Sequence, residues 1–61
     1  MPDVLLLQLD AKVAHVPSAT HGVALCGEVM RDPWQCGPAQ AIAQHAHQLC
    51  GACWERYRSA P

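Results

Sequence analysis

The sequence contains no phenylalanine and few other large aromatic side chains, with two tryptophans and one tyrosine among its 61 residues. A chain of this length has room for one domain and buries only about 60% of its unfolded surface. Because large side chains supply most of the burial energy of a core, a core with so few of them is marginal. We therefore expect residues 1–61 to form a single mini-domain that needs a disulfide, a metal ion or a partner chain for stability.

Long apolar runs are also absent. No stretch approaches the about 20 apolar residues that a membrane-spanning helix requires. The apolar stretch at residues 4–7 is too short for the hydrophobic part of a signal peptide, and no basic residue precedes it. We therefore expect a cytoplasmic protein with no membrane association. Cysteines stay reduced in that compartment, so the four cysteines favour a metal site over disulfides.

Basic residues are scarce too, since Lys and Arg number 4 against 5 for Asp and Glu, which gives a net charge of -1 at pH 7. Proteins that bind nucleic acids usually carry a basic stripe. Such a partner is therefore not favoured, and its patch would have to be built from Lys12, Arg31, Arg56 and Arg58. The sequence also offers no catalytic triad, no paired carboxylates and no glycine-rich phosphate loop, so we do not expect an enzyme.

The first half of the chain predicts a β-hairpin. Residues 7–15 alternate between apolar and polar side chains, with His15 continuing the apolar face, which is typical of a half-buried strand. Residues 16–22 are rich in Pro, Ser, Thr and Gly and predict a turn. The apolar residues 23–26 predict the returning strand. This hairpin would place His15 and Cys26 on opposite strands near the loop.

The second half is less regular. Residues 36–38 predict a break, and residues 39–49 fit either an Ala-rich helix after Pro38 or an alternating strand that leads into Cys50. Composition favours the helix, and both alternatives stay open. Residues 49–53 predict a tight turn, and residues 54–59 predict a short terminal helix that starts at or near Cys53.

The motif with the most specific chemistry is Cys50-Gly51-Ala52-Cys53. Two intervening residues allow both thiolates to reach one tetrahedral ion from a single turn. A helix that starts at the motif also favours thiolate, because the N-terminal end of a helix is partly positive. One such motif supplies half of a site, so two further ligands must come from elsewhere in the chain.

The predicted hairpin supplies His15 and Cys26 as the other two ligands. The resulting set of three cysteines and one histidine is typical of structural zinc. A four-cysteine site with Cys36 in place of His15 is the alternative, and a redox pair or an iron–sulfur cluster is less favoured because neither fits the length or the spacings. We expect His21, His45 and His47 to be polar surface residues, and Trp34 and Trp54 to anchor the core.

The order of these motifs resembles that of small zinc-finger-like proteins of actinobacteria and their phages. The resemblance covers roughly residues 9–58. It rests on His15-Val16-Pro17, on Leu25-Cys26-Gly27 and on the closing Cys50-x-x-Cys53 before a helix. It implies zinc binding by His15, Cys26, Cys50 and Cys53, and it implies no settled activity.

Together these observations predict an α+β, zinc-stabilised domain of the zinc-ribbon or zinc-finger kind, with a β-hairpin and a short C-terminal helix. We expect the protein to be an interaction or accessory module that works with a protein partner or as a homo-oligomer, pairing through an edge strand at residues 5–9. A nucleic-acid-binding regulator is the second hypothesis. A small redox or metal-handling protein that uses its CxxC motif is the third.

Overall fold

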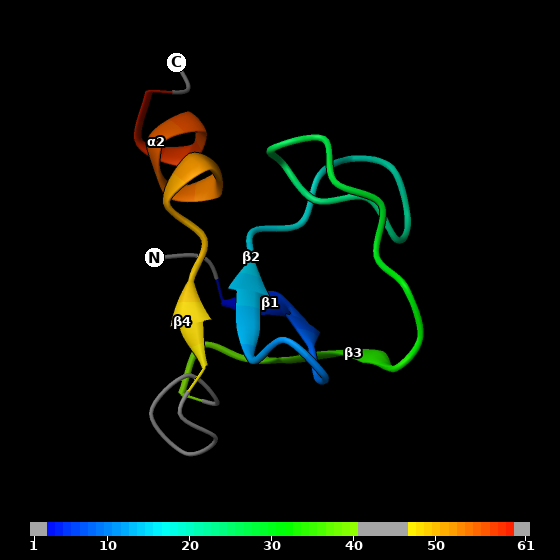
Figure 1. Cartoon of the computed structure of the whole chain (residues 1–61). Helices are drawn as coiled ribbons and strands as arrows, with labels where there is room; N and C mark the ends of the chain where they lie inside the picture. The colour runs from blue at the N-terminus through cyan, green and yellow to red at the C-terminus, as the bar shows by residue number, and fades with distance from the viewer. Residues whose placement is uncertain (1–2, 41–46, 60–61) are drawn as a thin grey trace.

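The computed structural model describes residues 3–40 and 47–59. These residues form a four-stranded sheet and one helix, and their order along the chain is β1 (Val4–Gln8), β2 (Val13–His15), β3 (Trp34–Pro38), β4 (Gln48–Leu49) and α2 (Gly51–Ser59). The predicted α+β class is therefore confirmed. In Figure 1, α2 continues upward from β4, and the loop between β2 and β3 extends beside it. Within these ranges, no helix has the length and apolar character needed to cross a bilayer.

Strand β1 lies inside the sheet, whose strand order is β3-β1-β2-β4. It pairs antiparallel with β2, where Leu7 is opposite Ala14, and antiparallel with β3, where Leu7 is opposite Gln35. The expectation that residues 5–9 form an edge strand is therefore wrong. The apolar run of Leu5, Leu6 and Leu7 is buried on both faces, which is typical of a central strand.

The single strand that the sequence pattern predicts over residues 7–15 is interrupted by a turn, so that β1 and β2 form a hairpin of their own. Residues 9–12 form a turn in place of a continuous strand, and Gln8 pairs with Val13 across it. Lys12 adopts a φ of 53° in this turn, a left-handed conformation that usually marks Gly or Asn. The alternating pattern therefore runs through a turn that carries no turn-forming glycine.

The predicted return at residues 23–26 is present as isolated backbone pairing and lacks a regular strand. Pro17 and Ala24 form an antiparallel bridge. The N–H of Leu25 donates to the carbonyl of Val16 at 2.7 Å. These contacts fold residues 16–26 back on themselves, so the chain that follows β2 returns to the end of that strand.

The second half of the chain contains two corrections. Residues 36–38 belong to β3, where a break was expected, and their strand is held by pairing with β1. The end of the segment that composition assigned to a helix, Gln48–Leu49, forms β4 and pairs parallel with β2. Residues 41–46 of that segment lie outside the described residues. Helix α2 begins at Gly51, two residues before the predicted start.

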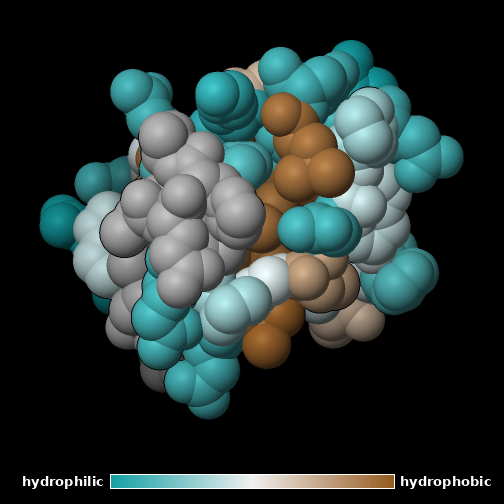
Figure 2. All heavy atoms as spheres, turned by 90° about the horizontal axis from the view of Figure 1, so that it is seen from below, coloured by the Kyte–Doolittle hydropathy of each residue, from teal (hydrophilic) through white to brown (hydrophobic). Residues whose placement is uncertain are grey.

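The core is small and is centred on β1. Its buried residues are Leu5, Leu6, Leu7, Ala14, Val16, Ala24, Met30 and Cys53. Trp34 is half-buried and packs against this cluster, whereas Trp54 stacks on Tyr57 along α2. Figure 2, which views the molecule from the end opposite α2, shows a strip of hydrophobic residues reaching the surface between hydrophilic ones. The described residues thus bury few large side chains.

Candidate metal centre

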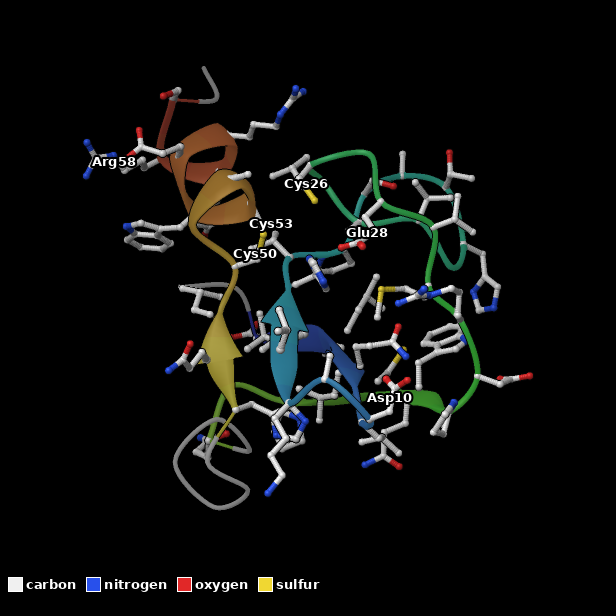
Figure 3. All side chains as sticks on the ribbon, in the orientation of Figure 1. Asp10, Cys26, Glu28, Cys50, Cys53 and Arg58 are labelled. Carbon is white, nitrogen blue, oxygen red and sulfur yellow. The ribbon has the colours of Figure 1, made fainter. Side chains whose placement is uncertain are left out.

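Four potential ligands meet where β2, the following loop and α2 come together. His15 is the last residue of β2, Cys26 lies in the returning loop, Cys50 precedes α2, and Cys53 lies in the first turn of that helix. In Figure 3, Cys50 and Cys53 lie at the base of α2 and Cys26 lies beside them on the loop. The structure therefore brings together the four residues that the sequence predicted as a set.

The distances from His15 to two sulfurs of this cluster match those around a tetrahedral ion. One ligand atom from each residue can be chosen so that all four lie within 4.8 Å of one another. His15 Nδ1 lies 3.5 Å from Cys53 Sγ and 3.8 Å from Cys26 Sγ. Tetrahedral zinc with ordinary bond lengths separates a nitrogen from a sulfur ligand by about 3.6 Å and two sulfurs by about 3.8 Å. All four cysteines of the chain are free thiols, so no disulfide competes for these sulfurs.

Backbone hydrogen bonds hold the CxxC half of the cluster. The N–H of Cys50 donates to the carbonyl of Ala14 at 2.8 Å, which ties the CxxC motif to the strand that carries His15. The N–H of Trp54 donates to the carbonyl of Cys50 at 3.0 Å, which closes the first helical turn around the motif. In the folded chain these two hydrogen bonds hold the CxxC motif next to His15.

The loop ligand Cys26 lies in a turn that requires glycine. Gly27 has a φ of 96°, in the region that L side chains rarely adopt, and its N–H donates to the carbonyl of Ala24 at 2.9 Å. Burial on its own raises the pKa of the Cys26 thiol. Hydrogen bonds from the Glu28 backbone and from Cys53 and Cys50 outweigh that effect and leave the pKa below its ordinary value. The turn thus favours thiolate at Cys26.

Cys53 has the opposite character. It is fully buried, and this burial raises the pKa of its thiol to about 11. Without an ion the sulfur is therefore protonated at neutral pH. A metal ion would displace that proton, since the thiolate is the form that coordinates.

Glu28 is the residue that the sequence did not reveal. Its Oε2 lies 3.1 Å from His15 Nε2, on the side of the imidazole away from the sulfurs. The sequence alone makes Glu28 look isolated, because thirteen positions separate it from His15. Its place two residues after Cys26, beyond a turn glycine, is the only signal that could have pointed to it.

The other candidate ligands that the structure describes are not part of the cluster. Cys36 is exposed on β3, so the four-cysteine alternative is not assembled. His21 is exposed as predicted, and its ring lies 5.7 Å from that of Trp34. His47 is buried, which corrects its assignment to the polar surface. His45 lies outside the described residues.

Three of the four basic residues named for a nucleic-acid patch do not lie together. Lys12 lies in the β1–β2 turn, whereas Arg56 and Arg58 lie on α2. In Figure 1 that turn and that helix are at opposite ends of the molecule. Arg58 is also within 3.7 Å of Glu55, which offsets part of its charge.

No family model matches this chain, and neither a curated protein nor a solved structure is significantly similar to it.

Proposed function

We propose that His15, Cys26, Cys50 and Cys53 bind one Zn²⁺ ion and that this ion holds the domain together. The observation that carries the proposal is the agreement between the His15–sulfur distances, 3.5 and 3.8 Å, and those of tetrahedral zinc. Thiolate and imidazole ligands also select zinc over magnesium or calcium, which prefer oxygen. With four protein ligands the ion has no open position for a substrate or an activated water, so its role is structural.

Metal content and ligand choice can be tested together by native mass spectrometry of the zinc-loaded chain. We expect one zinc ion per chain in the wild type. Cys50→Ser and His15→Ala remove a ligand each and are expected to lose most of that zinc. Cys36→Ser, a matched cysteine outside the cluster, is expected to keep it. A wild-type chain without zinc, or equal loading of all variants, would contradict the proposal.

For the biological role, we propose an interaction or accessory module of the cytoplasm, a compartment that suits four free thiols. Two exposed valines, Val4 at 47% and Val29 at 64%, offer apolar surface to another chain. Edge strands β3 and β4 replace residues 5–9 as the candidates for strand pairing.

Self-association distinguishes a homo-oligomer from a module that needs a different partner. Sedimentation velocity of the zinc-loaded chain over a wide concentration range is expected to show an increase in sedimentation coefficient if the partner is a second copy. A constant monomer would remove the homo-oligomer and leave a different protein as the partner.

A further inference from the structure

We propose that Glu28 is a positioning residue of the metal centre: its carboxylate accepts a hydrogen bond from His15 Nε2–H and thereby presents Nδ1 to the metal. This inference rests on the proposed zinc site and concerns how that site is built. Figure 3 shows Glu28 and Cys26 on the same loop, the one that follows β2.

The geometry assigns a different role to each nitrogen of the imidazole. Nδ1 faces the sulfurs of Cys53 and Cys26, and Nε2 faces the Glu28 carboxylate at 3.1 Å. A neutral imidazole carries one proton, so a ring that coordinates through Nδ1 must carry its proton on Nε2. The carboxylate is placed where that proton needs an acceptor. Carboxylates in this position fix the tautomer and raise the basicity of the ligand.

Glu28 is held in place by its backbone and is not a loose surface contact. Its carbonyl accepts a hydrogen bond from the N–H of Ala24 at 2.8 Å. The next residue, Val29, forms a bridge with Val23. The His15 side chain is only 5% exposed, whereas that of Glu28 is 54% exposed. Replacing Glu28 therefore leaves the buried core intact and removes the partner of His15.

Glu55 provides a matched control. It lies two residues after Cys53, as Glu28 lies two residues after Cys26, and it is exposed on α2 near Arg58. If zinc affinity depended only on the negative charge near a ligand cysteine, removing Glu28 or Glu55 should weaken binding to a similar extent. If the effect depends on the contact with His15, only the substitution of Glu28 should weaken zinc binding.

The test is zinc affinity measured by competition with a chromophoric chelator. We expect Glu28→Ala to weaken binding about 10- to 100-fold, in the range typical of lost carboxylate partners of histidine ligands. Glu28→Gln keeps a carbonyl acceptor and should recover part of the loss. Glu55→Gln should stay within about twofold of wild type, given how little exposed ion pairs contribute.

Repeating the Glu28 substitution in a chain that lacks the His15 imidazole separates a positioning role from a general effect on loop stability. In a His15→Cys chain the ligand has no second nitrogen, so Glu28→Ala should cost less than about threefold there. An equal loss in both backgrounds would overturn the inference. As an independent readout, ¹⁵N NMR of the zinc-loaded wild type should place the His15 proton on Nε2, and a proton on Nδ1 would overturn it as well.

The two proposals fail differently. A wild-type chain that binds no zinc overturns the zinc site itself and this inference with it. A wild-type chain that binds one zinc ion, with Glu28→Ala binding equally well, overturns only the positioning role of Glu28.

Discussion

Gly27 is the residue on which the geometry of the loop ligand most depends. Its φ of 96° turns the chain between Cys26 and Glu28, so one residue places both a candidate ligand and the carboxylate beside His15. Apart from Gly27 and its two chain neighbours, no described residue has an atom within 4 Å of the position that a Cβ would occupy at Gly27. The requirement for glycine is therefore one of backbone conformation and not of space.

This requirement predicts the effect of Gly27→Ala. An L residue with this φ is strained by about 1–2 kcal/mol, so the zinc-loaded variant should be less stable by that amount. Gly51→Ala is the control, because Gly51 also has open space around it but begins α2, where alanine is favourable. Urea unfolding of the zinc-loaded chains measures both. Equal stability of the two variants would contradict the account of this turn.

At the residue scale, the sequence was sufficient to predict the cluster but not its surroundings. The CxxC spacing and the Cys-Gly dipeptide are local signals, and the turn-forming residues 16–22 indicated that Cys26 returns toward His15. Glu28 could not be predicted, because its partner is far away along the chain and a single exposed glutamate has no pattern. The burial of His47 likewise follows from packing that no short spacing reveals.

Among the elements, β1 is hydrogen-bonded through a side chain to the long loop between β2 and β3, which carries Cys26. Gln8 is buried at the end of β1, and its Nε2 donates to the carbonyl of Arg31 at 2.7 Å. Its Oε1 accepts from the N–H of Arg31 at 3.2 Å. The side chain therefore pairs with both backbone groups of Arg31, in the manner of a further strand residue.

Gln8→Ala should consequently destabilise the zinc-loaded chain by about 1–3 kcal/mol, because it leaves a backbone donor and acceptor of the loop without their partner. Gln35→Ala is the matched control, since Gln35 is exposed on the neighbouring strand β3 and should change stability by less than about 0.5 kcal/mol. Hydrogen exchange of the Arg31 amide gives a local readout. Unchanged protection of that amide in Gln8→Ala would contradict this role.

The elements were predicted less well than the site. The α+β class and the C-terminal helix follow from composition and from the chain breakers. The β1–β2 turn was missed because its left-handed position is occupied by Lys12, where a glycine or asparagine would have signalled a turn. Strand β3 was missed because Cys36-Gly37-Pro38 has the composition of a break, and only pairing with β1 makes it a strand. The position of β1 inside the sheet depends on long-range pairing, which local periodicity does not contain.

For the whole molecule, the cluster connects segments that are far apart in the chain. His15 lies eleven residues from Cys26 and 38 residues from Cys53. The buried core between these segments contains three leucines and no aromatic residue among its fully buried members. A tetrahedral ion would cross-link β2, the loop and α2 where apolar packing is thin. Binding energies of such sites, on the order of 10 kcal/mol at neutral pH, exceed what this core supplies.

The most direct measurement is the amide NMR spectrum of the chain before and after its metal is removed by a strong chelator. We predict a dispersed spectrum with zinc, collapse to the narrow range of an unfolded chain once the ion is withdrawn, and full recovery when zinc is returned. A spectrum that keeps its dispersion in a chain shown to be free of metal would contradict the claim that the ion holds this domain together.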